Sequence, residues 1–240
     1  MKLPNETKFA AGRAASDASR HGRWYNDACG TAFGLEILGE RWALLVVREL
    51  MLGPRRFSDL RATLPGISAK VLTERLAALE ASGVVIRQPL PTPAKGQAYG
   101  LSAWGHAAEP LIQELGRWAA QSSAHNPRLP LSPVSLMLSL RTMLDPGKCD
   151  RFPAVKIGFV IGDEQFLAEP AGRTLPIRRA RPDEADAVFR APDAAVLAGG
   201  IYAGLCWEEL EQNAALVIEG DRALALQFVD LFHLPPPLAS

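Results

Sequence analysis

The sequence predicts an α+β protein of two domains, a mainly helical domain followed by one built on an antiparallel sheet. Residues 26–82 carry apolar side chains at helical spacing, whereas two extended runs flank a turn at Gly162-Asp163. Between these regions, the Ser/Pro-rich stretch at 122–133 interrupts the pattern. We therefore expect a flexible arm at 1–24, a first domain at 25–122, a linker at 123–133 and a second domain at 134–240.

The composition is that of a globular protein with unequal charge in its two halves. Hydrophobic residues make up 48% of the 240 residues, and the formal net charge is zero. Residues 1–125 hold 15 Lys and Arg against 11 Asp and Glu, or +4, so residues 126–240 carry −4. A mild basic excess in the first half permits a nucleic-acid partner without requiring one.

Cysteine usage and hydropathy favour a reducing, aqueous compartment. Cys29, Cys149 and Cys206 are far apart, and no CxxC pair occurs. No apolar run reaches the roughly 18 residues of a membrane helix, and no apolar segment typical of a secretory signal follows the first lysine. The expected location is the cytoplasm.

The first domain is predicted to contain helices at 26–53, with a break at Gly39, and at 57–64 and 68–82. Ser68 is expected to cap the last of these helices, and Gly83 to follow its end. Extended runs at 84–88 and 97–102 then predict a hairpin. This order of elements is that of a winged helix-turn-helix.

The helix at 68–82 has two different faces. At about 100° per residue, Leu72, Leu76 and Leu79 share one side, which must face a core. The opposite strip is polar, of low bulk, and carries one cation, as suits a helix that lies in a major groove. This strip consists of Lys70, Thr73, Glu74 and Ala77.

Several motifs then occur in a recognisable order. They are a cysteine at the start of the first helix, G-E-R-W-A-L-L at 39–45, R-F-S-D-L, P-G-I-S, V-L-T-E-R-L, and Y-G-L-S-A-W-G at 99–105. Over residues 25–122 the chain resembles the HxlR-type winged-helix transcriptional regulators of bacteria and archaea. The resemblance implies a dimeric, nucleoid-associated DNA-binding protein. The sequence departs from the family pattern at Ala103-Trp104, where a charged pair is frequent, and in a proline-containing wing that is poor in cations.

If the helix binds DNA, its first residues reach the base edges. Lys70 would donate to guanine, the Thr73 methyl would meet a thymine methyl, and Glu74 would accept from a cytosine amine. Arg75, at the border of the apolar face, suits either a buried ion pair or a phosphate contact. The residues expected to bind the DNA backbone are Ser68, Arg55 and Arg56, with Arg87 and Lys95 on the hairpin. The alternative is that these are ordinary surface cations.

A helix is predicted at 103–121, and it bears an apolar seam. Trp104, Ala108, Leu111, Leu115 and Trp118 recur at alternating spacings of four and three residues. The seam, with the first helix, predicts a homodimer contact, although packing within its own domain would give the same pattern. A proline within this helix, at position 110, would remove a hydrogen bond and kink it.

The second domain is similar, over about 135–235, to sterol-carrier-protein-type lipid-binding domains. The resemblance is sharpest at 196–233, where Ile218-Glu219-Gly220-Asp221 leads into a helix. It implies an apolar tunnel between sheet and helices, and hence a lipophilic small-molecule effector or a role in lipid binding and transfer. Each candidate lining residue, taken alone, is more often a core residue than a ligand contact. The candidates are Phe159, Phe166, Val196, Leu197, Tyr202, Trp207, Phe228 and Phe232.

A redox switch is the other form of regulation that the sequence offers. Cys29 matches a family cysteine that some members use as an oxidant sensor. At the start of a helix its thiol pKa would be lowered, although a small buried side chain would fit the position equally.

Catalysis is not expected. The sequence has no GxSxG, HExxH, Walker or GxGxxG motif after a strand, and its four histidines are widely spread. We therefore predict no enzyme activity, metal or cofactor.

Overall fold

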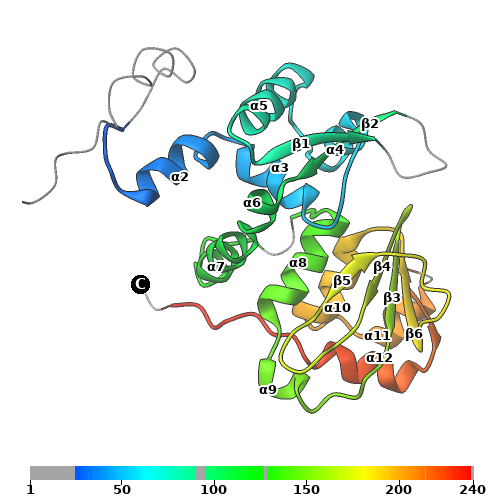
Figure 1. Ribbon diagram of the computed structural model, residues 1–240. Helices are drawn as coiled ribbons and strands as arrows, with labels where there is room; N and C mark the ends of the chain where they lie inside the picture. Colours follow the sequence, from blue (N-terminus) through cyan, green and yellow to red (C-terminus); the bar gives the residue numbers. More distant parts are fainter. Residues whose placement is uncertain (1–24, 90–95, 127–128, 214, 239–240) are drawn as a thin grey trace, which may run out of the picture.

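The computed structural model describes residues 25–89, 96–126, 129–213 and 215–238, in two lobes (Figure 1). The upper lobe is formed by residues 25–126, here called the N-terminal half, and the lower lobe by residues 129–238, the C-terminal half. The predicted arm at 1–24 and the hairpin residue Lys95 lie outside the described residues. No helix in the described ranges is both long and apolar enough to span a bilayer.

The N-terminal half begins with four helices. They are α2 (Gly30–Leu38), α3 (Ala43–Leu50), α4 (Phe57–Thr63) and α5 (Ala69–Ala81). The expected break between the first two falls at residues 39–42, where Trp42 adopts the left-handed conformation at φ 79°. Helix α3 supplies the centre of the lobe, because Val46, Val47 and Leu50 on it are fully buried.

A hairpin follows, and it gains a third segment from earlier in the chain. Strands β1 (Val85–Pro89) and β2 (Gln97–Leu101) pair antiparallel. Arg55, just before α4, pairs its backbone with Tyr99 of β2 through two hydrogen bonds of 2.8 Å. The start of α4 and the hairpin therefore form one unit.

The predicted single helix at 103–121 is wrong. The chain instead forms α6 (Ala103–His106) and α7 (Glu109–Ala120), which are separated by a break at residues 107–108. Pro110 then lies in the first turn of α7. Amides in the first turn have no acceptor within the helix, so the missing N–H of proline costs no hydrogen bond there. Because the chain breaks before Pro110, the proline does not kink either helix.

The C-terminal half is a five-stranded sheet with helices. In chain order the elements are α8 (Pro133–Met143), α9 (Pro146–Cys149), β3 (Ile157–Ile161), β4 (Glu164–Ala168), β5 (Ile177–Arg179), β6 (Ala187–Ala191), α10 (Ala194–Tyr202), α11 (Trp207–Gln212), β7 (Val217–Gly220) and α12 (Arg222–Val229). Helices α10 and α12 pack on β6, and α8 packs beside α10.

The sheet is mixed and not antiparallel as expected. Its order is β5-β4-β3-β6-β7, and the central pair β3 and β6 is parallel. A parallel pair needs a long crossover. Here the crossover contains β4 and β5, which add to the sheet on the side of β3 away from β6. The β3–β4 hairpin is therefore visible in the sequence, but the parallel pairing of β3 with β6 is not.

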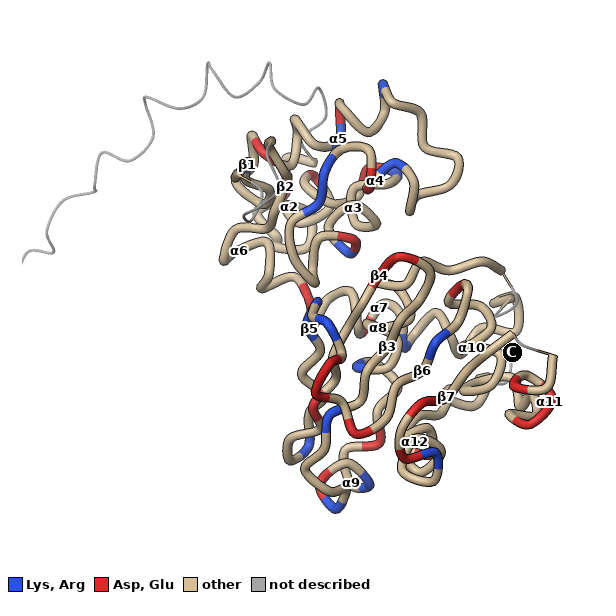
Figure 2. The backbone as a smooth tube through the Cα atoms, turned by 90° about the vertical axis from the view of Figure 1, so that its right-hand side faces the viewer, with Lys and Arg blue, Asp and Glu red and all other residues tan. Residues whose placement is uncertain are grey.

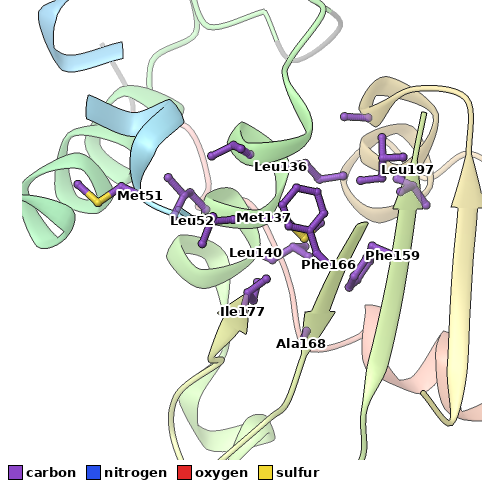
Figure 3. Packing of buried hydrophobic residues seen from close by; sticks show 14 of the residues in the cluster. Met51, Leu52, Leu136, Met137, Leu140, Phe159, Phe166, Ala168, Ile177 and Leu197 are labelled. Carbon is purple, nitrogen blue, oxygen red and sulfur yellow. The ribbon is translucent and has the colours of Figure 1, made fainter. Parts of the chain in front are cut away.

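One buried apolar cluster extends through both halves. Figure 3 shows Leu52 of the N-terminal half beside Met137 of α8, with Met51 farther away, and Phe166 of the sheet close to Met137 on the other side. All four side chains belong to the same buried cluster. Helix α8 packs against both α3 and α7. The two halves are therefore joined by a continuous core.

Candidate nucleic-acid interface

Helix α5 is seated as its sequence predicts. Leu72, Leu76 and Leu79 are almost completely buried. The Ser68 Oγ accepts a hydrogen bond from the Val71 amide at 3.2 Å, which confirms the expected cap. Gly83 follows the helix at φ 78°, a conformation that favours glycine. The leucines hold the helix from behind, so that its opposite side faces solvent.

The outward strip of α5 is exposed along its length. Lys70, Thr73, Glu74 and Ala77 are all exposed, as is Ser68. The Thr73 hydroxyl donates to the Ala69 carbonyl at 2.9 Å, so its donor is already used and its methyl is left for apolar contact. In the described part of the chain, no hydrogen bond or ion pair engages the Lys70 amine. This strip therefore presents the Lys70 amine as a donor and the Thr73 methyl as an apolar group, with little bulk between them.

Two of the arginines expected at the DNA are engaged within the protein. Arg55 is only 8% exposed, and its Nη1 contacts Glu164 Oε1 of the C-terminal half at 2.5 Å. The second lobe therefore covers the side chain that the sequence assigned to a DNA phosphate. Arg75 lies 3.5 Å from the Glu40 carboxylate with its side chain 20% exposed, which is the ion-pair alternative.

The other predicted backbone contacts remain on the surface. Arg87 on β1 is bonded to Glu80 at 3.1 Å, and its guanidinium lies 5.5 Å from the centre of the Tyr99 ring. Arg56 is exposed at the start of α4. Arg87 lies on strand β1 and Arg56 directly precedes α4.

A second exposed feature is apolar. On α7, Leu111, Leu115 and Trp118 lie on one face, and Trp118 is 69% exposed. Trp104 of α6 is half exposed, as are Phe33 and Leu35 of α2, a helix that projects from the lobe (Figure 1). Ala108, which was expected on the same seam, instead packs on the core. We call these six exposed side chains the α2/α7 surface.

Cys29 lies at the start of α2 and is exposed, not buried. The backbone amide of Thr31, then the Thr31 side chain and the Ala32 amide, lower the pKa of the Cys29 thiol. Cys149 is buried, and burial raises the pKa of its thiol. Cys29 is therefore an accessible thiol with increased thiolate character.

The predicted ligand lining forms part of the packed core. Phe159 stacks on Phe189 at 5.5 Å between ring centres and lies 6.1 Å from Phe228. Phe166, Leu197 and Phe232 are also buried, and Figure 3 shows Phe166 and Leu197 close to Phe159. The sequence assigned these side chains to a tunnel wall, but they fill the space between sheet and helices themselves.

The remaining members of that set close the edge of the same core. The Tyr202 hydroxyl accepts from Ser139 Oγ at 2.9 Å, and burial raises the pKa of Tyr202. The Trp207 ring lies over Gly200 and 5.7 Å from Phe189, while Val196 packs on the cluster. Hollows of about 940 Å³ between α2 and α5, and about 750 Å³ where the halves meet, have other linings.

These features define a class of protein. A buried-leucine helix with an exposed polar strip, a preceding short helix and turn, and an adjoining antiparallel hairpin form a winged helix-turn-helix for binding DNA. The family described as HxlR-like helix-turn-helix matches residues 37–127 of this chain.

Relatives from Bacillus subtilis agree. The uncharacterized HTH-type transcriptional regulator YvaP is 40% identical over 87 residues, which are 36% of this chain and 81% of that protein. The HTH-type transcriptional regulator YodB is 46% identical over 92 residues, 38% of this chain and 80% of its own. A solved structure of reduced YodB covers 41% of this chain and 97% of its own at 40% identity, with a TM-score of 0.36. The chain belongs to the HxlR-like helix-turn-helix family of transcriptional regulators.

Proposed function

We propose that this protein is a homodimeric regulator that binds a specific operator with α5 of each subunit in the major groove. The observation that carries the proposal is the exposed strip of Lys70, Thr73, Glu74 and Ala77, held outward by three buried leucines. We further propose the division into a DNA-binding domain at 25–122, a linker at 123–133 and a second domain at 134–240.

Each exposed residue of the interface has a chemical role in this proposal. Lys70 donates to guanine, the Thr73 methyl contacts thymine, and Glu74 accepts from cytosine. Ser68 at the helix start and Arg56 on α4 bind phosphate, while Arg87 binds flanking phosphate after exchanging its bond to Glu80. Arg55 and Arg75 contribute through contacts within the protein.

The α2/α7 surface is proposed as the dimer contact. Large apolar side chains are exposed on α2, α6 and α7, and exposed apolar surface of this kind marks a site of protein association. A two-fold axis through this surface would present two copies of α5 to half-sites about 34 Å apart, or a multiple of that distance.

The experiment that tests the proposal is capture of genomic DNA fragments by the purified protein, followed by sequencing. A recurrent two-fold sequence would supply the operator. Failure to enrich any sequence over bulk DNA would contradict specific binding.

Lys70→Ala is expected to weaken operator binding by about 1–3 kcal/mol, because it removes the one cation on the outward strip. Mobility-shift titration against operator and scrambled DNA measures the change. Lys156→Ala, which removes a cation paired with Glu184 in the C-terminal half, is the matched control and should bind like wild type. Equal operator affinity of Lys70→Ala and wild type would exclude Lys70 as a base-reading residue.

Redox regulation through Cys29 is a second candidate function, favoured by the exposure of the thiol and the amides that lower its pKa. We expect Cys29 to react with iodoacetamide faster than Cys206, whose thiol donates to the Glu208 carboxylate at 3.2 Å. Mass spectrometry of peptides after timed alkylation compares the two directly. Slower labelling at Cys29, or DNA binding that peroxide leaves unaltered, would remove the redox proposal.

The C-terminal half is proposed to be sterol-carrier-like. Strand β7 ends at Gly220, and Asp221 Oδ1 caps α12 by accepting from the Leu224 amide at 3.0 Å, as that resemblance implies. A lipophilic effector would have to displace the Phe159 cluster, because those side chains occupy the space between sheet and helices. The packed core therefore weakens the alternative of a lipid-transfer protein.

A further inference from the structure

A single carboxylate connects the two halves next to the hairpin. Glu164 is the first residue of β4, and its Oε1 accepts from Arg55 Nη1 of the N-terminal half at 2.5 Å. Its Oε2 accepts from Arg179 Nη1 at the end of β5. The exposed fractions of the Arg55, Glu164 and Arg179 side chains are 10%, 16% and 25%, so solvent screens the group weakly. Figure 2 shows the acidic end of β4 facing the upper lobe.

Arg55 transmits this contact to the DNA-binding elements through its own backbone. Its N–H donates to the Tyr99 carbonyl and its carbonyl accepts from the Tyr99 N–H, both at 2.8 Å. Tyr99 in turn pairs with Arg87 across the hairpin. The next residue, Arg56, is the N-cap of α4. Arg55 is thus tied both to the middle of strand β2 and to the start of α4.

Other polar contacts between the halves attach to different elements. Ser132 Oγ donates to Glu49 of α3 at 2.7 Å, and Arg141 contacts Glu109 of α7 at 2.7 Å. These contacts fix α8 against the helical core and do not involve the hairpin. The Glu164 contact differs from these, because its partner Arg55 is hydrogen-bonded to Tyr99 of the hairpin.

The group is incompletely satisfied. Arg55 Nε and both Arg179 Nε and Nη2 are buried without a hydrogen-bond acceptor in the described part of the chain. Desolvation lowers the pKa of Arg179, against the influence of the nearby Glu164. Opening the contact would hydrate these donors and offset part of the lost ion pairing.

We infer that Glu164 is a positioning residue for DNA binding: it holds the middle of the hairpin in place through Arg55 and Tyr99, so that the C-terminal half sets operator affinity. The inference rests on the proposed function of the N-terminal half. A shift at the β3–β4 turn would reach the hairpin through this carboxylate without any contact between the C-terminal half and DNA.

The test is Glu164→Gln in the full chain, which keeps the shape of the side chain and removes its charge. Operator affinity is expected to fall by about 2- to 30-fold. Hydrogen exchange should rise at Tyr99 and Arg55 and stay unchanged in α3 and α8. The matched control is Glu219→Gln, which breaks the exposed Arg190 pair at 2.7 Å on the same sheet. This control should alter neither quantity.

A double-mutant cycle separates positioning from general loss of stability. If Glu164 acts through Arg55, Arg55→Gln combined with Glu164→Gln should bind DNA no more weakly than the weaker single variant. Glu164→Asp shortens the side chain but keeps the charge, so hydrogen exchange should again rise at Tyr99 and Arg55. This variant replaces Glu164→Gln in the test if Glu164→Gln does not fold.

Two results would overturn the inference. One is unchanged exchange at Tyr99 in both Glu164 variants, and the other is a rise spread uniformly through α3 and α8. Absence of operator binding by the wild-type protein would contradict the proposed function instead, and the exchange experiment would still decide the coupling.

Discussion

Replacing Trp118 with glutamate is expected to convert the proposed homodimer into monomers and lower operator affinity by about 10²- to 10⁴-fold. Trp118 is 69% exposed and stands beside Leu111 and Leu115 on one face of α7. A charge in the centre of an apolar contact costs its full desolvation when the contact forms. Each monomer would then bind one half-site without the gain from the second.

Sedimentation equilibrium measures the assembly state, and mobility shift with one or two half-sites measures the affinity. Val217→Glu is the control, since Val217 is an exposed apolar residue on β7, outside the α2/α7 surface. It should leave both measurements unchanged. A Trp118→Glu protein that still sediments as a dimer would place the contact elsewhere.

Phe159→Ala is expected to lower the free energy of unfolding by about 3–5 kcal/mol. Phe159 is fully buried and packs on Phe189 and Phe228, so the truncation leaves a cavity in the core. If Phe159 instead lined an open tunnel, its removal would enlarge existing space at much smaller cost. The magnitude therefore distinguishes a filled core from a ligand cavity.

Urea denaturation followed by circular dichroism measures this difference. Val217→Ala, at an exposed position, should change the free energy of unfolding by no more than about 0.5 kcal/mol. A loss below about 1 kcal/mol for Phe159→Ala, with the control unchanged, would favour the tunnel and restore the lipid-binding alternative.

The exposed polar strip of α5 could be predicted from the sequence because its determinants are local. Periodicity placed Leu72, Leu76 and Leu79 inside, and the capping serine and terminal glycine set the ends of the helix. All of these signals lie within 20 residues of one another, so they do not depend on what the rest of the chain does.

The sequence was less informative where distant segments decide the outcome. The burial of Arg55 depends on Glu164, 109 residues away, which no local pattern connects to it. The parallel pairing of β3 with β6 is likewise set by the crossover between them. The sequence of a single strand does not indicate whether its partner will be parallel or antiparallel. Aromatic side chains such as Phe159 fit a core or a cavity wall equally well until their neighbours are placed.

The buried Glu49 has a consequence for any attempt to shorten this protein. Its carboxylate is fully enclosed in α3, and the Ser132 hydroxyl that caps α8 is one of its donors. Met51 and Leu52, nearby in the chain, are covered by the same shared core. A fragment that ends at residue 122 would therefore expose the apolar side chains that the C-terminal half covers, and the Glu49 carboxylate would lose a donor. We expect such a fragment to aggregate more readily than the full chain.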